Sequence, residues 1–229
     1  TYLDRRRADA RPLKLADVSL QVEFPPKSMR AGQRQKPLRF QGGARGTQIQ
    51  ELNFAGEFDK AQRHWNIQGR LRGLMVAAEL KRSVPLTWVK PFQQFGDYRT
   101  QADLQFELSG QMPHHAATVS GRAMVSASSI SESVQFVVDG ELTEGHLAFD
   151  SRLPFPLTEI TAKIHCDNER FDVRAFDARC GRTTVSGAFR CDGYGLQHPY
   201  SLSAKANNVH LVEYAPVLDV LPRTVKQHW

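Results

Sequence analysis

The sequence lacks a long apolar run and a cysteine framework. No stretch of about 18 consecutive apolar residues occurs, so we expect no transmembrane helix here, and the first residues show no signal-peptide pattern. The three cysteines, Cys166, Cys180 and Cys191, have no metal-ligand spacing and leave an odd thiol over. On a meander of strands, Cys166 and Cys191 would lie two strand steps apart, about 9.6 Å. That separation is too long for a disulfide, and we expect the thiols to act as small hydrophobes.

Signatures of catalysis and of metal or nucleotide binding are also absent. The eight histidines are scattered, without a His-Glu-x-x-His pair, and no Gly-x-Ser-x-Gly elbow or phosphate-binding glycine loop occurs. Ser120 and Ser186 fall on the polar side of their strands without a nearby base. Carboxylate pairs lie beside turns, where they serve turn formation and solubility. We therefore predict a protein that is not an enzyme and has no cofactor or metal.

Positive charge is concentrated at the start of the chain. Residues 1–46 carry 11 Lys and Arg against 4 Asp and Glu, a net +7, and the other residues carry 19 against 20, a net −1. Such a stretch could meet nucleic acid or anionic lipid. No nucleic-acid reading motif follows it, so we interpret it as solvated charge and expect no nucleic-acid partner.

Strict alternation of apolar and polar residues dominates the rest of the sequence. It runs through 52–58, 65–71, 102–108, 119–125, 134–138, 160–166, 185–189 and 202–206, with turn sequences such as DKAQRH, MPHH, DNER and GR between runs. This pattern is typical of antiparallel strands with one apolar and one wet face. In FDVRAFDARC the apolar register shifts between Ala175 and Phe176, which predicts a bulge and a curved sheet.

Glycine recurs among the inward positions of these runs. The stretch TTVSGAF at 183–189 has near-copies in LNFAGEF, WNIQGRL, FELSGQM, ATVSGRA and FVVDGEL. A glycine inside a strand costs backbone entropy and contributes no side chain. Two interpretations stay open: the glycines bend the sheet, or they make room on an apolar surface that acyl chains could occupy.

Two segments depart from alternation and predict short helices. PLTWVKPFQQF covers 85–95, and apolar residues recur at helical spacing in 211–229. We predict a mainly β fold, a long and strongly curved antiparallel sheet or groove with one or two short helices. The expected organisation is a basic lead-in with a first strand (1–46), a first groove section (47–84), a short helix or linker (85–97), a second groove section (98–211) and a C-terminal helix (212–229).

Residues 153–189, LPFPLTEITAKIHCDNERFDVRAFDARCGRTTVSGAF, resemble the AsmA-like superfamily of bacterial envelope proteins, of the AsmA, TamB and YhdP type. Residues 86–110 resemble the short helix and following strand of that family, although the usual Pro-x-Gly is here Gly96-Asp97-Tyr98. The resemblance implies a segment of a longer periplasmic protein with an inner-membrane anchor outside this segment. It implies a repeating β-groove that conducts phospholipid towards the outer membrane, with further repeats at both ends and other envelope proteins as partners.

The candidate lipid-contacting residues are the inward apolar residues and glycines of the strands. They are Phe54, Trp65, Ile67, Gly69, Leu104, Phe106, Val119, Gly121, Phe136, Val138, Ile160, Ile164, Val185, Gly187 and Phe189. The alternative is a non-catalytic scaffold in which the same residues fill a closed β-sandwich core. A carbohydrate-active β-enzyme would need paired inward carboxylates, and the sequence does not show them.

Overall fold

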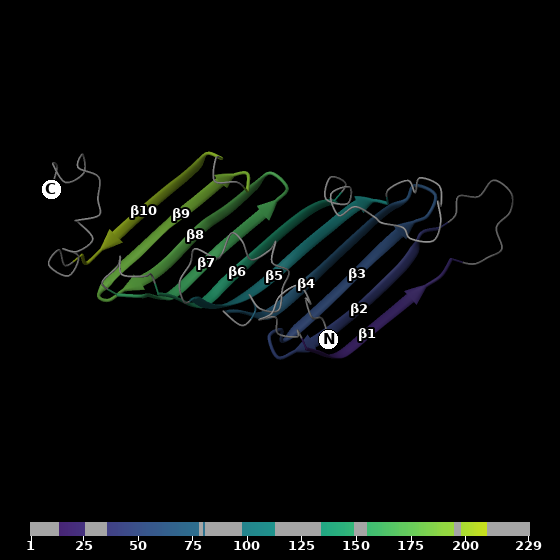
Figure 1. The fold of residues 1–229 in the computed structure, drawn as a ribbon, viewed down its shortest axis with the longest axis horizontal. Helices are drawn as coiled ribbons and strands as arrows, with labels where there is room; N and C mark the ends of the chain where they lie inside the picture. The colour runs from purple at the N-terminus through teal and green to yellow at the C-terminus, as the bar shows by residue number, and fades with distance from the viewer. Residues whose placement is uncertain are drawn as a thin grey trace, which may run out of the picture.

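Ten strands of the chain form one antiparallel sheet whose spatial order follows the sequence order (Figure 1). The computed structural model describes residues 14–25, 36–77, 80, 98–112, 134–148, 155–194 and 198–209. The strands are β1 (Leu15–Glu23), β2 (Leu38–Gly46), β3 (Glu51–Asp59), β4 (His64–Ala77), β5 (Tyr98–Gln111), β6 (Val134–Leu147), β7 (Leu157–Asp167), β8 (Arg170–Cys180), β9 (Thr183–Asp192) and β10 (Tyr200–Asn207). The predicted mainly β fold with a long antiparallel sheet is confirmed.

Alternating side chains, and short turns after β2, β3, β7 and β8, favour this meander. In β4, Trp65 and Ile67 are half-buried while Asn66 and Gln68 are exposed. At the turn between β7 and β8, one carboxylate oxygen of Asp167 accepts hydrogen bonds from the backbone N–H groups of Glu169 and Arg170, at 2.8 and 3.0 Å. Such local capping favours a tight turn over a longer connection, so consecutive strands pair as neighbours.

The described strands make a single open layer. β1 and β10 lie at opposite ends of the sheet (Figure 1), and substantial contacts join only neighbouring strands. Burial is correspondingly thin, because no large side chain of the described residues is completely buried. The buried apolar residues of the described ranges are Ala44, Ile49, Ala102, Ala162, Ala178 and Cys180. One layer therefore has a wet face and an apolar face with little core of its own.

Bulges along one long edge twist and bend the sheet. Asp17, Gly73, Glu144 and Glu159 have φ values of 49°, 59°, 53° and 52°, and the strand register shifts beside each of them. β1 and β7 start at this edge, whereas β4 and β6 end there, so all four irregularities share the lower edge in Figure 1. An extra residue in one strand increases the local twist.

The bulge expected in β8 is confirmed. Between Val173 and Phe176 the pairing of β8 with β9 shifts, which spans the predicted position at Ala175. The sequence therefore located this bend to within two residues.

The structure describes only some of the predicted sections of the chain. The basic stretch 1–46 contains two strands, β1 and β2, where one was expected. The two predicted groove sections join in one sheet, because β4 pairs directly with β5. The predicted helices at 85–97 and 212–229 and the run at 119–125 lie outside the described residues. Among the residues that the structure describes, no helix is long and apolar enough to cross a membrane.

The bulges supply a matched pair of stability predictions. Gly73 has positive φ, and its N–H donates to Asp103 Oδ1 at 2.8 Å. We expect Gly73→Ala to lower the free energy of unfolding by about 1–2 kcal/mol, because a Cβ is disfavoured in this conformation. Glu144→Gly should leave stability unchanged or raise it, because it relieves the same strain in β6. Urea unfolding of both variants tests this, and equal losses would contradict the expectation.

Candidate functional site

Apolar side chains of all ten strands align on one face of the sheet, here called the apolar face. Directly paired residues of antiparallel strands point to the same side, so the register defines continuous rows. One row contains no charged or amide side chain and runs through Leu20, Gly42, Phe54, Gly69, Phe106, Val138, Cys166, Phe171, Cys191 and Tyr200. Nine steps between ten strands, of about 4.8 Å each, give it a length of about 43 Å.

A second uncharged row lies beside the first, two residues along each strand. It runs through Ala44, Leu52, Leu71, Leu104, Gly140, Ile164, Val173, Phe189 and Leu202. On β4 the apolar positions from Trp65 to Leu71 extend over about 20 Å, at about 3.4 Å per residue. The apolar face is therefore a broad band rather than a single line of contacts.

All described candidates from the sequence lie on this face. The register brings together Phe54, Trp65, Ile67, Gly69, Leu104, Phe106, Phe136, Val138, Ile160, Ile164, Val185, Gly187 and Phe189. Val119 and Gly121 lie outside the described residues. The role of these residues in lipid contact stays a prediction.

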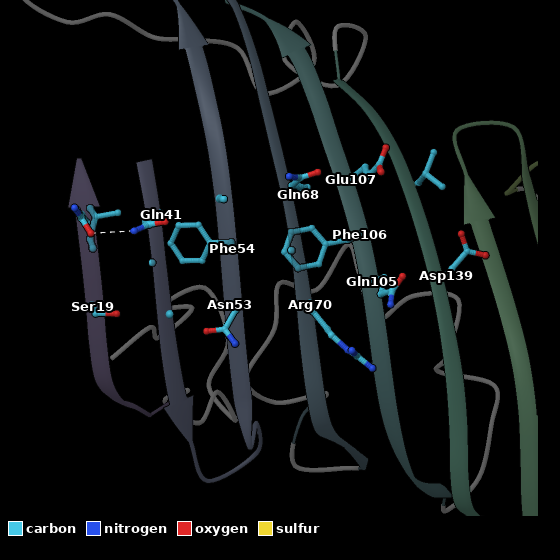
Figure 2. Close-up of a pocket in the computed structure, with 17 residues that line it drawn as sticks. Ser19, Gln41, Asn53, Phe54, Gln68, Arg70, Gln105, Phe106, Glu107 and Asp139 are labelled. Atoms are coloured by element: carbon cyan, nitrogen blue, oxygen red, sulfur yellow. Dashed lines mark hydrogen bonds between the residues drawn. The ribbon is translucent and has the colours of Figure 1, made fainter. Parts of the chain in front are cut away.

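Aromatic rings occupy the room left by the glycines. A Cβ built on Gly42 would lie 2.8 Å from Cζ of Phe54, and a Cβ on Gly69 would collide with Phe106. Phe40 stands in the same relation to Gly56. Figure 2 shows the rings of Phe54 and Phe106 nearly face-on, each reaching towards the preceding strand. The glycines therefore let rings lie flat on the sheet, and they do not open pockets in the apolar face.

The apolar face is half-exposed along its whole length. The large candidate side chains are each partly accessible, and among the described residues no second sheet covers them. At the two end strands the exposure rises further, to 64% for Leu20 and 74% for Tyr200. A soluble monomer rarely leaves a large contiguous apolar surface uncovered, so such a surface marks an interaction site.

An aromatic cluster ends the apolar face near the turns of β7 to β10. The ring centroid of Phe189 lies 6.3 Å from that of Phe171 and 6.4 Å from that of Tyr200. The ring of Tyr194 lies 6.2 Å from Phe136, and its hydroxyl donates to the carbonyl oxygens of Asp167 and Arg170 at 2.5 and 2.9 Å. Burial raises the pKa of Tyr194 to about 12, so this hydroxyl stays protonated as a donor.

The cysteines contribute to the same apolar surface. Cys166 and Cys191 both lie opposite Phe171 of the intervening strand, as expected, and none of the three cysteines forms a disulfide within the described residues. Burial and the nearby carboxylates of Asp167 and Asp139 raise the pKa of the Cys166 thiol. A thiol that stays protonated is a poor nucleophile.

The opposite face, here called the polar face, carries an ionic network over β6 to β9. His165 is only 8% exposed, and its ring nitrogens lie 2.9 Å from Asp139 and 3.3 Å from Asp167. Arg174 and Arg170 extend the network from Asp139 and Asp167. Within the described residues no group of His, Cys, Asp and Glu is arranged to hold a metal ion.

The sequence analysis did not predict that His165 lies between two carboxylates on the polar face. Alternation in TAKIHC already places His165 on the polar side together with Asp167. The third member, Asp139, comes from another strand and becomes adjacent only through the pairing of β6 with β7. The network fixes charge on the polar face and leaves the apolar face uncharged.

No family model, curated protein or solved structure matches the chain. The resemblance to the AsmA-like superfamily covers residues 50–211, is clearest from residue 133 onward, and stays a prediction. The fold and the composition of the two faces are independent of that resemblance.

Filling a glycine position should destabilise the sheet. In Gly69→Val the new side chain would displace the Phe106 ring and crowd the carbonyl oxygen of Asn53, which lies 2.6 Å from an ideal Cβ. We expect a loss of about 1–3 kcal/mol in the free energy of unfolding, measured in urea. Ala55→Val is the control, because position 55 lies on the polar face of the adjacent strand, where valine is favourable. Equal stability of the two variants would show that the ring contact does not matter.

Acid should weaken the turn between β7 and β8. A hydrogen bond from the Glu169 N–H, with further bonds from Arg170 N–H and His165, lowers the pKa of Asp167 against desolvation. A lowered folded pKa gives stability that is complete above the ordinary carboxyl range and is lost as pH falls through the folded value.

Asp167→Asn keeps the acceptor oxygen of the turn but cannot titrate. We expect this variant to be less stable at pH 7 and to lose less stability on acidification than the unmodified chain. Chemical unfolding at several pH values between 7 and 2 measures how the free energy of unfolding of each protein changes with pH. Identical pH dependence in the two proteins would show that Asp167 does not contribute.

Proposed function

We propose that the apolar face binds phospholipid acyl chains and conducts them across the sheet. In this proposal the chain is a segment of a periplasmic AsmA-like protein that has an inner-membrane anchor and delivers phospholipid towards the outer membrane. The observation that carries the proposal is the uncharged row of side chains that crosses all ten strands. The protein acts by binding and guiding lipid, without a catalytic step.

The dimensions and chemistry of the face suit an acyl chain. One leaflet contributes about half of the roughly 30 Å hydrocarbon thickness of a bilayer, or about 15 Å. The apolar positions of β4 extend over about 20 Å, so acyl chains can lie across the band while the headgroup remains in water. Apolar contact stabilises bound lipid by about 25 cal/mol per Å² removed from water.

Continuity of the row is what would allow movement. Between neighbouring strands the surface changes from one apolar side chain to another or to a glycine covered by a ring, as at Gly69 and Phe106. A lipid that moves by one strand therefore exchanges similar contacts. A charged side chain in the row would oppose this movement, because it would have to lose water beneath the acyl chain.

The alternative scaffold role needs a covered face. A closed β-sandwich buries its apolar surface against a second sheet. The described strands form one sheet, and its large apolar side chains keep partial exposure. These observations favour lipid binding over a closed core.

Adjacent residues of β6 offer a matched test. Val138 lies in the row beside Phe106, whereas Val137 is 39% exposed on the polar face beside Glu107. We expect Val138→Asp to reduce co-purifying phospholipid at least fivefold in native mass spectrometry. Val137→Asp should retain the lipid of the unmodified chain. Circular dichroism checks that both variants fold.

A second measurement covers the case in which Val138→Asp does not fold. A photoreactive phenylalanine derivative at position 138 should crosslink to phospholipid in vesicles, and the same derivative at position 137 should not. Equal crosslinking at both positions, or a folded Val138→Asp variant with undiminished lipid, would refute acyl binding on the apolar face.

A further inference from the structure

The polar face carries a broad groove over β1 to β6. Five residues of the first apolar row also line the groove, because each lies between two polar-face residues of its strand: Leu20, Gly42, Phe54, Gly69 and Phe106. Its volume is about 780 Å³, within the range of small-molecule sites. Two rows of side chains border it, one through Gln21, Gln41, Ala55, Gln68, Glu107 and Val137, the other through Ser19, Gly43, Asn53, Arg70, Gln105 and Asp139. The groove therefore runs across the strands, and we call it the amide groove.

Small residues make the floor and long ones make the walls. Gly43 and Ala55 interrupt rows that are otherwise formed mainly by amide and charged side chains. Figure 2 shows Gln68 beside Glu107 and Arg70 reaching from β4 towards β5. A ligand lying over Ala55 would be bordered by these longer side chains.

The amides of the groove have free hydrogen-bonding capacity. Gln41 donates to Gln21 at 2.9 Å. Three other amide side chains, those of Asn53, Gln68 and Gln105, make no hydrogen bond with another described residue. Each amide offers two donors and an acceptor, and all three lie within the same cavity.

Ion pairs are placed outside the middle of the groove. Arg39 pairs with Glu57 at 3.2 Å and Arg72 pairs with Glu51 at 3.7 Å, near the two ends of β3. The dense network around His165 lies further along the sheet, on β6 to β9. The ionic network meets the groove at Asp139, and the middle of the groove around Ala55 is lined mainly by amide side chains.

The geometry points to a linear, uncharged oligosaccharide as the ligand of the amide groove. Sugar hydroxyls donate and accept hydrogen bonds, as amides do, and a linear chain matches a groove that crosses six strands. A peptide would gain little, because the sheet backbone beneath the groove is already paired between strands. An anionic polymer would find no excess of positive charge, because Arg70 is the one cation among the lining residues, Glu107 opposes it, and Asp139 is already paired with Arg174.

Isothermal titration with maltohexaose and with chitohexaose tests this assignment on the complete chain. We expect at least one of them to bind, and the double change Gln68→Ala with Gln105→Ala to raise its Kd at least tenfold. Ala55→Phe should abolish binding by filling the floor while circular dichroism remains unchanged. Gln111→Ala is the control, because Gln111 is an exposed amide at the end of β5 outside the groove.

Three outcomes would overturn the proposal. The first is absence of binding by both oligosaccharides, and the second is binding that Ala55→Phe does not weaken. The third is binding that disappears in 0.5 M salt, because charge and not amide hydrogen bonding would then carry it. Since the groove and the apolar face lie on opposite sides, Val138→Asp should leave the Kd for oligosaccharide unchanged.

Discussion

The hydrogen-bonded register between neighbouring strands is the constraint on which the rest of this structure depends. Because each strand pairs with the next one in sequence, a side chain keeps its face from one end of the sheet to the other. A slip of one residue at the pairing of Phe54 with Gly69 would turn Phe54 towards water and bring Asn53 into the apolar row. The capped turns after β3 and β7 hold this register locally, and the bulges at the lower edge bend the sheet without breaking the rows near its middle.

The two faces then acquire opposite chemistry from the same strands. On the apolar face, glycines accept the flat rings of neighbouring strands, so the surface is apolar and low in relief. On the polar face, the network around His165 and the amides around Ala55 gather the hydrogen-bonding groups. A sheet of one layer gains little stability from a buried core, so cross-strand pairs carry more of its stability than in a two-layer domain. This division supports an acyl ligand on one side and a hydroxyl-rich ligand on the other.

Alternation in the sequence was sufficient to predict β3 to β10, their apolar side and the bulge near Ala175, because these depend on local periodicity. It did not separate β1 from β2. The separation of Cys166 from Cys191 also followed, since it depends only on strand order. The contact of Phe106 with Gly69 could not be predicted, because alternation gives the face of a residue but not its partner on the next strand. The position of Asp139 beside His165 and the cavity over Ala55 depend on the same long-range pairing. From the sequence, the glycines could either bend the sheet or leave room on the apolar face. In the structure, the rings of Phe54 and Phe106 fill the space beside Gly42 and Gly69.

The most direct test of the account is NMR line broadening by phospholipids that carry a nitroxide on the acyl chain. If acyl chains lie across the apolar face, the methyl signals of Leu20, Val138 and Leu202, from three distant strands, should all broaden. The signal of Val137, on the opposite face of β6, should remain sharp. Broadening of Val137 equal to that of Val138, or broadening confined to the two end strands, would contradict a continuous lipid path across the sheet.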